Sequence, residues 1–375
     1  MVKNKKLQRL IILAIICLFF VPTNYSKPSY ANDWSYGSMA VMCDDVLVYN
    51  KEENKKLPMA STTKIFTALT VIENCKNLAD QVVVPKEAVV VEGTSIYLKQ
   101  NERLTVEELL YGLMLRSGND AAVALAVHTA GTCDEFAKLM NATATKYGLK
   151  NTSLKNPHGL DQKDHYTTAK DLATFTMHSL KNPIFRKIVS SKSYEIAERE
   201  NCPYRYFVNK NRLLNSLDGC IGVKTGYTSK AGRCLVSAIN DGEKDIVCVV
   251  LNCKPMFEES MKLLTKAKDE YAKQVVLKDY AIVGEVSVQD GEKTSCKVYH
   301  KKGFARIVKK CDLNDISITY DYPKTIKAPI KKDEKIGVVK VFAKNDLIFE
   351  DNLYIIEEVK SKSIIDKLKN ILKKW

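Results

Sequence analysis

Three short segments, far apart in the sequence, carry residue types that could together form and break an acyl bond on a serine. They are Ser61–Lys64, Ser117–Asn119 and Lys224–Gly226. A serine hydroxyl becomes an effective nucleophile only when a neighbouring group accepts its proton. None of the three segments contains a histidine. The pattern therefore predicts a lysine amine as the base.

The first segment places the two partners at a suitable spacing. Lys64 follows Ser61 by one helical turn, and residues at that spacing lie one above the other on a helix face. Because an ammonium cannot accept a proton, Lys64 must be held neutral by burial or by a nearby cation that lowers its pKa. Lys224 of the third segment is the candidate for that cation.

The other two segments predict the walls around the nucleophile. Residues 222–227 are typical of a short strand, which could offer backbone N–H groups to an oxyanion and the Thr225 hydroxyl to a substrate carboxylate. Ser117 would pass a proton to the leaving amine from the opposite wall. Asn119 would hydrogen-bond Lys64 and the substrate amide.

Each segment alone has a more ordinary interpretation. Ser-x-x-Lys is usually the solvated face of a helix, Ser-Gly-Asn a turn, and Lys-Thr-Gly the end of a strand. Here all three occur in one order, each in a fitting context: an apolar helix, a helix leading into a turn, and a hairpin. The combination favours an active site.

These segments and their surroundings resemble the low-molecular-mass penicillin-binding proteins of the D-alanyl-D-alanine carboxypeptidase family. The resemblance is strong over about residues 35–280 and extends beyond the three motifs. The segments that carry it are Pro58–Ile65, Thr105–Leu115 with Ser117–Ala122, Asn156–Asp161 with His165–Ala169, and Lys224–Thr228 with Ala231–Gly232.

The resemblance implies a serine carboxypeptidase that removes the terminal D-alanine from peptidoglycan stem pentapeptides through an acyl-enzyme, with β-lactams acylating the same serine. It also implies that the backbone N–H of Ser61 supplies half of the oxyanion hole. No cofactor is expected. The residues it implies are Ser61 as nucleophile, Lys64 as general base, Ser117 and Asn119 as the second catalytic wall, and Lys224, Thr225 and Gly226 as the substrate-binding strand.

Three alternatives stay open from the sequence. A class A β-lactamase shares two of the motifs but has an aspartate where Gly118 stands here, and it has no β domain or tail. A penicillin-binding sensor or wall-binding module would not need the activated nucleophile. An endopeptidase acting on crosslinks is the third alternative.

The two ends of the chain predict an envelope protein. A basic stretch over residues 3–9 precedes an apolar run over 10–21, and small residues around Ala31 predict a signal peptide at 1–31. Within residues 359–375, apolar residues recur every three or four positions and lysines occupy the positions between them, a pattern that predicts an amphipathic helix ending in Trp375. We expect this helix to lie on the outer face of the cytoplasmic membrane after export. An uncleaved anchor and a C-terminal helix packed on its own domain are the alternatives.

The intervening sequence predicts an α/β (α+β) protein of two domains. A β-lactamase/transpeptidase-like catalytic domain is expected at 32–280, and a small all-β domain at 281–358 that would hold the enzyme away from the membrane or bind a partner. Thr105 with Glu108 forms a capping box. A helix is expected over 256–274 at the end of the catalytic domain.

The charge, cysteines and histidines argue against a nucleic-acid-binding, disulfide-rich or zinc-binding protein. The net charge is +14, but no basic helix with interleaved aromatic residues indicates nucleic-acid binding. The 11 cysteines lack a disulfide framework, so mostly reduced thiols are expected. His158 and His165 lie near each other without a metal motif and are expected to stabilise a loop rather than to bind zinc.

Overall fold

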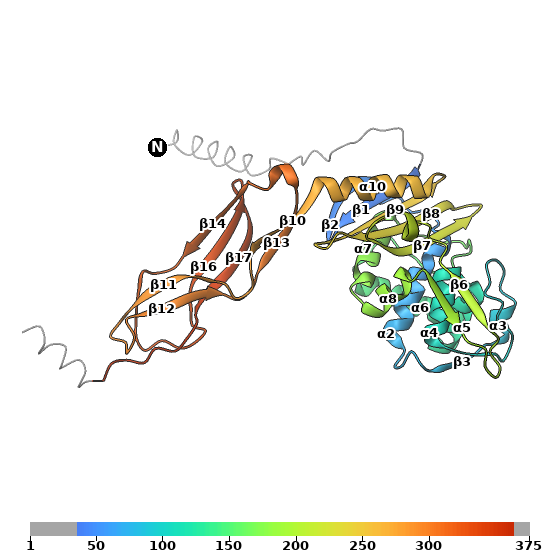
Figure 1. The fold of residues 1–375 in the computed structure, drawn as a ribbon, viewed down its shortest axis with the longest axis horizontal. Coiled ribbons are helices and arrows are strands. Elements are labelled where there is room, and N and C mark those ends of the chain that lie inside the picture. Colours follow the sequence, from blue (N-terminus) through green and yellow to red (C-terminus); the bar gives the residue numbers. More distant parts are fainter. Residues whose placement is uncertain (1–35, 364–375) are drawn as a thin grey trace, which may run out of the picture. The chain divides into compact units, whose positions relative to one another are not determined.

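A computed structural model of the chain describes residues 36–363. The leader expected at 1–31 lies outside these residues, as does most of the helix expected at 359–375. In the part that the structure describes, no helix is long and apolar enough to cross a bilayer. The fold is mixed α and β, as the sequence predicted, with a β-rich part after the part that carries the motifs (Figure 1).

A five-stranded antiparallel sheet organises the part of the chain with the motifs. The strand order is β2-β1-β9-β8-β7, which leaves β7 at one edge. Lys224 and Gly226 lie on this edge strand, so backbone groups along its outer side have no strand partner. The strands are β1 (Tyr36–Cys43), β2 (Val46–Lys51), β7 (Cys220–Thr228), β8 (Gly232–Asn240) and β9 (Asp245–Cys253).

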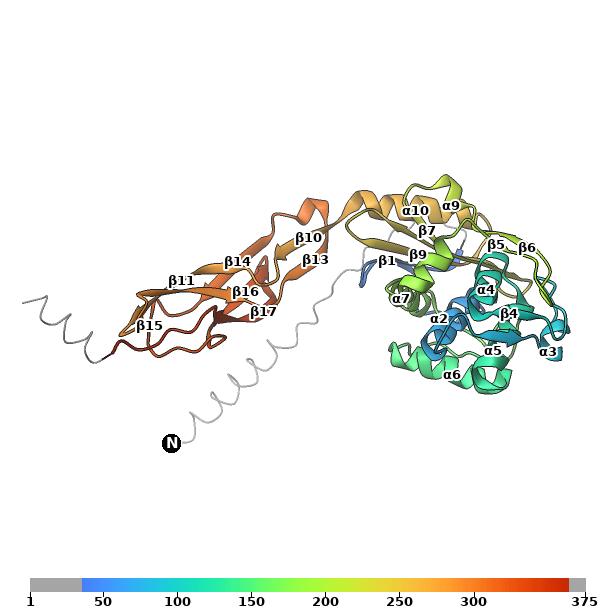
Figure 2. The same ribbon diagram turned by 60° about the horizontal axis from the view of Figure 1, so that its bottom comes forward.

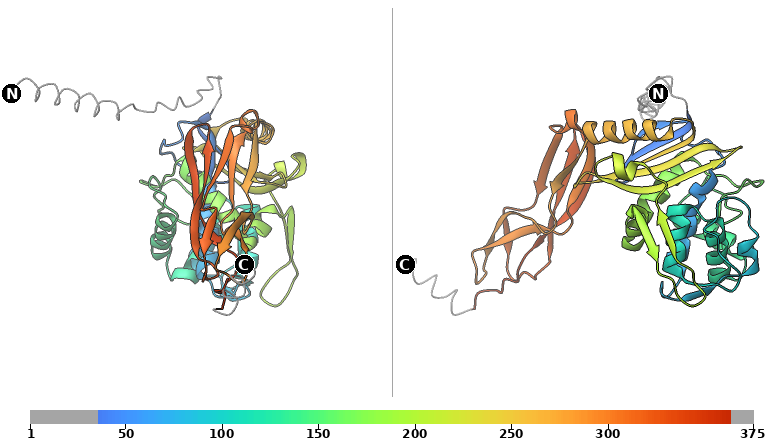
Figure 3. Two further views of the ribbon diagram at one scale, coloured as in Figure 1. Left: turned by 90° about the vertical axis from the view of Figure 1, so that its left-hand side faces the viewer. Right: turned by 45° about the vertical axis from the view of Figure 1, so that its right-hand side comes forward.

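Helices cover both faces of this sheet. Figure 3 shows α10 (Met256–Glu270) on one face and the helical part on the other, where α7 (Ala169–Leu180) and α8 (Pro183–Ser190) lie closest to the strands. Residues 234–239 of β8 and 246–251 of β9 are all buried. Double coverage explains why these strands read as uninterrupted apolar runs rather than as alternating ones.

The remaining helices gather around a largely buried helix that begins at the first motif. Every residue of α2 from Lys64 to Ile72 is buried, and Figure 2 shows α4, α5 and α6 around it. The expected capping box is present: Glu108 N donates to Thr105 Oγ1 (3.1 Å), and Thr105 N donates to the Glu108 carboxylate (2.8 Å). The members are η1 (Ala60–Thr63), α2 (Lys64–Asn74), α4 (Val106–Tyr111), the π-helical turn η2 (Gly112–Arg116), α5 (Asn119–Ala130) and α6 (Cys133–Lys146).

Short elements support this helical part at its periphery. The hairpin β5–β6 lies beside α4 (Figure 2), where the rings of Tyr111 and Tyr194 stack at 3.6 Å between centroids. Next to it, the buried carboxylate of Glu102 pairs with the buried guanidinium of Arg205. The short elements are β3 (Gln81–Val83), α3 (Lys86–Val89), β4 (Arg103–Thr105), β5 (Ser193–Ile196), β6 (Arg205–Val208) and α9 (Leu213–Ser216).

The β-rich part contains a two-stranded and a six-stranded sheet. β10 pairs with β13, and the larger sheet has the order β14-β16-β17-β12-β11-β15. Its own apolar core includes Val298, Val339, Val341 and Leu353, all fully buried. The strands are β10 (Tyr271–Leu277), β11 (Ile282–Gln289), β12 (Ser295–His300), β13 (Phe304–Lys309), β14 (Ile316–Asp321), β15 (Thr325–Lys327), β16 (Lys335–Ala343) and β17 (Asp346–Ile355).

Three features differ from the sequence expectations. The helix expected over 256–274 ends at Glu270, because residues 271–277 pair with β13 and this pairing overrides their helical propensity. Strand β15 is three residues long, which is too short for an alternating pattern to reveal it in the sequence. Val359 bridges to Ile330 and is buried, so the chain is still extended where the C-terminal helix was expected to begin.

The cysteines of the described part are all free thiols. Burial raises the pKa of Cys248 to about 12, so this thiol is protonated and packs as a small apolar side chain. Within residues 36–363, no cluster of three side chains of the metal-ligating types is present.

Candidate active site

The first motif forms the turn that opens α2. Ser61 lies in the short turn η1 and Lys64 is the first residue of α2, with Lys64 Nζ 3.0 Å from Ser61 Oγ. Ala60, immediately before the nucleophile, has a φ of 49°. This left-handed conformation is unfavourable for a residue other than glycine and is typical of functional sites that the surrounding structure holds in place.

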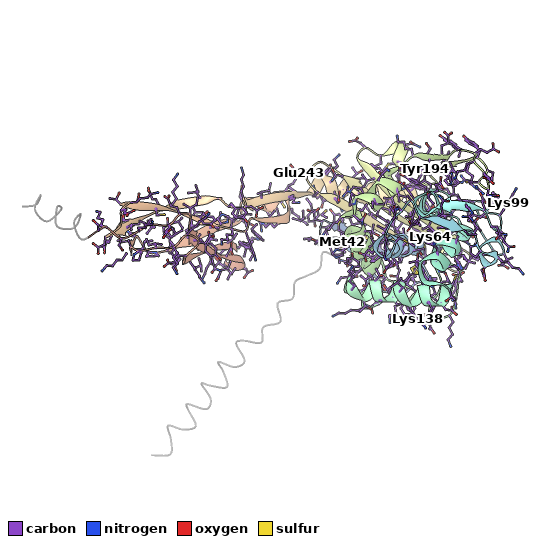
Figure 4. The ribbon with its side chains drawn as sticks, turned by 90° about the horizontal axis from the view of Figure 1, so that it is seen from below. Met42, Lys64, Lys99, Lys138, Tyr194 and Glu243 are labelled. Atoms are coloured by element: carbon purple, nitrogen blue, oxygen red, sulfur yellow. The ribbon has the colours of Figure 1, made fainter. Side chains whose placement is uncertain are left out.

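Two further acceptors fix the amine of Lys64. Nζ lies 2.6 Å from Asn119 Oδ1 and 2.7 Å from the carbonyl oxygen of His158. The side chain is fully buried. Figure 4 shows Lys64 in the interior, whereas Lys99 and Lys138 point outward at the periphery.

The surroundings of Lys64 disfavour its charged form. Burial is the main cause, and the neighbouring charges of Lys224 and Lys210 add to it; together they hold the pKa of Lys64 well below its ordinary value, with Asp120 opposing them. Burial and Lys210 also lower the pKa of Lys224, to about 7. The structure therefore supplies both conditions that the sequence required for a neutral base.

The second motif lies between a π-helical turn and α5. Ser117 has a φ of 67°, which ends η2 and turns the chain before Asn119 begins α5. Asn119 N donates to the carbonyl oxygen of Thr94 (2.6 Å), and its amide Nδ2 donates to that of Glu92 (2.6 Å). The Asp120 carboxylate accepts backbone N–H groups of the same loop, so the loop and the motif hold each other in place.

The third motif lies on β7, directly beside the nucleophile turn. A Cβ added to Gly226 would lie 3.1 Å from the backbone nitrogen of Ser61, so a larger residue would fit here only if the nucleophile turn moved by a few tenths of an ångström. Side chains alternate between the faces of a strand, so Lys224 lies on the same face as Gly226 and Thr225 on the opposite one. Lys224 is 1% exposed, and its Nζ donates to the carbonyl oxygen of Thr225 (3.0 Å).

The ring of His165 holds the nucleophile turn, and the ring of His158 accepts a hydrogen bond within its own loop from the backbone N–H of Leu160 (3.2 Å). Lys155 N donates to His165 Nδ1 (2.9 Å), so Nε2 carries the proton and donates to Thr63 Oγ1 (2.9 Å). Thr63 in turn donates to the carbonyl oxygen of Ala60 (2.8 Å). Burial lowers the pKa of His165 to about 4 and is the main cause that lowers that of His158 to about 3, so both rings are neutral at pH 7.

A cavity of about 570 Å³ opens onto these motifs. Ser61, Ser117 and Thr225 all line it. The structure therefore brings residues of all three motifs to one site, with Lys64, Asn119 and Lys224 buried beneath it.

Comparisons with known proteins agree with this site. The D-alanyl-D-alanine carboxypeptidase family matches residues 38–255, and the family described as penicillin-binding protein 5, C-terminal domain, matches residues 271–361. The chain belongs to the D-alanyl-D-alanine carboxypeptidase family. The carboxypeptidase DacF of Bacillus subtilis is 31% identical over 386 residues, which cover 99% of each chain.

Solved structures show the same relationship for this carboxypeptidase. Penicillin-binding protein 5 of Haemophilus influenzae is 26% identical with a TM-score of 0.72, covering 89% of this chain and all of that one. The DD-transpeptidase of Streptomyces K15 is 31% identical with a TM-score of 0.59, covering 63% of this chain and 97% of that one. The chain is a serine D-Ala-D-Ala carboxypeptidase that acts on peptidoglycan stem peptides and binds β-lactams.

Four cations on the cavity wall of the carboxypeptidase were not predicted as site residues. Arg116 directly precedes Ser117 in the sequence, and the strand register that pairs Arg233 with Tyr227 could have placed Arg233 at the site. Lys210 and Arg212 follow β6 and belong to no motif. Among the described residues that line the cavity, none is acidic.

Proposed function

We propose that this carboxypeptidase uses Ser61 as the nucleophile and neutral Lys64 as the base. The arrangement of Lys64 Nζ carries the proposal. A neutral amine has two N–H groups and one lone pair, and Asn119 Oδ1 and the His158 carbonyl oxygen can accept only N–H groups. When these two take the N–H groups, the lone pair is left for the hydroxyl of Ser61, 3.0 Å away.

The reaction then follows from the remaining groups. Ser61 Oγ bonds to the carbonyl carbon of the penultimate D-alanine as its proton moves to Lys64. The backbone N–H of Ser61 and an outward-facing N–H of β7 beside Gly226 would stabilise the oxyanion. The C–N bond breaks as Ser117 gives its proton to the leaving amine and takes up the proton that Lys64 accepted from Ser61, which leaves Lys64 neutral again. Water then hydrolyses the acyl-enzyme and releases the shortened peptide.

The carboxylate of the leaving D-alanine is assigned to Thr225 and Arg233. Both lie on the face of the sheet opposite Lys224: Thr225 follows Lys224 on β7, and Arg233 is the cross-strand partner of Tyr227, two residues from Thr225 on the same face. Both line the cavity. Lys224 was expected to share this task, but its amine is buried on the other face. We assign Lys224 instead to lowering the pKa of Lys64.

The test uses the full chain with diacetyl-L-Lys-D-Ala-D-Ala and, in parallel, benzylpenicillin. We expect release of D-alanine and a long-lived penicillin adduct on Ser61, both measured by mass spectrometry. Ser61→Ala should abolish both, whereas the exposed Ser229→Ala should retain both.

The other outcomes separate the alternative functions. Acylation without peptide cleavage would favour a sensor or an endopeptidase specific for crosslinks. Rapid turnover of benzylpenicillin would favour a β-lactamase. Peptide cleavage by Ser61→Ala would refute the proposed nucleophile.

We also propose that the enzyme is exported and held on the outer face of the cytoplasmic membrane by residues 364–375. The support is the sequence pattern of residues 1–31 and 364–375, which lie outside the described residues. Membrane fractionation of the full chain and of a chain ending at residue 363 tests the proposal, because this truncation keeps Val359 and its bridge to Ile330. A truncated enzyme that remains on the membrane would refute it.

A further inference from the structure

The cavity carries more positive charge than a D-alanine carboxylate requires. Arg116, Lys210, Arg212 and Arg233 all line it, and no described residue of its wall is acidic. Within residues 36–363, none of the four forms an ion pair with an acid. If Arg233 binds the terminal carboxylate, the other three cations remain without an acidic group to balance their charge. This argument rests on the proposed function.

These three cations line the same cavity, and two of them, Arg116 and Lys210, lie next to each other. The backbone N–H of Lys210 donates to the carbonyl oxygen of Leu115 (3.2 Å), which brings Lys210 beside Arg116. Burial and the charge of Arg116 lower the pKa of Lys210, as expected for two cations without a counter-charge. Arg212 lies over the ring of Phe257, with its guanidinium carbon 5.7 Å from the ring centroid.

The position of this cluster relative to the scissile bond follows from the roles of Ser117 and Thr225. The departing D-amino acid carries both the amine that Ser117 protonates and the carboxylate that Thr225 binds. A cavity lined by both residues must therefore receive the leaving group. Its volume of about 570 Å³ lies within the range of pockets that bind drug-sized ligands and is shared between the leaving group and the part of the peptide bonded to Ser61.

We propose that Arg116, Lys210 and Arg212 form a second anion subsite, which binds a carboxylate on the side chain of the leaving group. The ligand class is a D-amino acid with an acidic side chain, either free or as the D-configured residue of an acidic peptide. Arginine suits this task because its guanidinium stays charged and binds carboxylates with paired hydrogen bonds. The enzyme therefore cleaves acidic leaving groups in preference to neutral ones of equal size.

An isosteric substrate pair tests this inference. Diacetyl-L-Lys-D-Ala-D-Glu and diacetyl-L-Lys-D-Ala-D-Gln have the same size and the same terminal carboxylate, and differ only in the second charge. We expect the full-length enzyme to cleave the D-Glu peptide with a kcat/KM about tenfold higher than that of the D-Gln peptide. The ratio should fall as salt is added, because the subsite is open to solvent.

Variants locate the preference. Arg212→Gln and Arg116→Gln should each reduce the D-Glu to D-Gln ratio to about 2 or 3, whereas Lys230→Gln, an exposed change in the β7–β8 turn outside the cavity, should leave it unchanged. A ratio near 1 in the wild type would overturn the subsite, as would a ratio that neither arginine variant lowers. Failure to cleave the D-Ala peptide would instead count against the proposed function, so the two failures are distinguishable.

Discussion

Replacing Asn119 by aspartate tests whether neutral Lys64 is the base. The change is nearly isosteric and puts a negative charge where the amide oxygen now accepts from Lys64 Nζ. A carboxylate at this position favours the ammonium over the neutral amine. The variant should therefore keep Lys64 protonated at neutral pH, which removes the acceptor for the Ser61 proton.

The size of the effect follows from the distance. Asn119 Oδ1 lies 2.6 Å from Nζ. Because a carboxylate shares its charge between two oxygens, we place that charge at about 3.5 Å, and an effective dielectric of about 20 then gives ~5 kcal/mol in favour of the ammonium. The pKa of Lys64 should therefore rise by about three to four units, and the neutral fraction, and with it the acylation rate at neutral pH, should fall by at most the corresponding factor.

The assay is the second-order rate constant for benzylpenicillin acylation, followed by intact mass as a function of pH. For Asn119→Asp the rate should continue to rise with pH well beyond the point at which the wild-type rate levels off. Asn119→Ala is the control, because it removes the same hydrogen bonds without adding a charge. Asn119→Ala should be acylated more slowly than the wild type, but its rate should not level off at a higher pH. An Asn119→Asp profile that matches the wild type or the alanine variant would refute the assignment of Lys64.

Three further predictions follow from specific contacts. Gly159→Ala would place a Cβ 2.0 Å from the carbonyl oxygen of the residue before the nucleophile, at a φ of +87°. It should lower the free energy of unfolding by about 3 kcal/mol, measured by urea denaturation, whereas Gly148→Ala, at a φ of +75° with open space around it, should cost only about 1 kcal/mol. Arg205→Met leaves a buried glutamate unpaired and should cost about 3–5 kcal/mol; an unchanged melting temperature would contradict this. The KM for the D-Ala-D-Ala peptide should stay constant across pH 7, because Arg233 keeps its charge. If Lys224, whose pKa is lowered to about 7, bound the carboxylate, KM would rise above that pH.

Local signals in the sequence were sufficient for much of the fold. The capping box of Thr105 and Glu108, the helix after Ser61 and the hairpin β8–β9 each depend on residues close together in the chain. The pairing of β10 with β13 depends on residues about thirty positions apart. Nothing within residues 271–277 itself indicates that pairing. The helix predicted over 256–274 therefore extended beyond Glu270, where the observed helix ends.

The same limit applies to the site. Residue types and order predicted Ser61 and Lys64, because the chemistry of the pair is visible at helical spacing. Lys210 and Arg212 reach the cavity only through the packing of the chain after β6, and no motif marks them. The approach of Gly159 to the nucleophile turn is likewise a tertiary contact.

The site divides its cations between two tasks according to chemistry. Lys64 and Lys224 are buried on the nucleophile side of β7, where desolvation lowers their pKa values and makes proton transfer possible near neutral pH. A lysine that loses its charge near pH 7 cannot bind a carboxylate reliably. Arg212 and Arg233, on the cavity wall, carry guanidinium groups, which do not serve as bases and match the geometry of a carboxylate. On the edge strand β7, alternation places Lys224 on the face of the nucleophile and Thr225 on the face of Arg233, so proton transfer and anion recognition use opposite faces of the sheet.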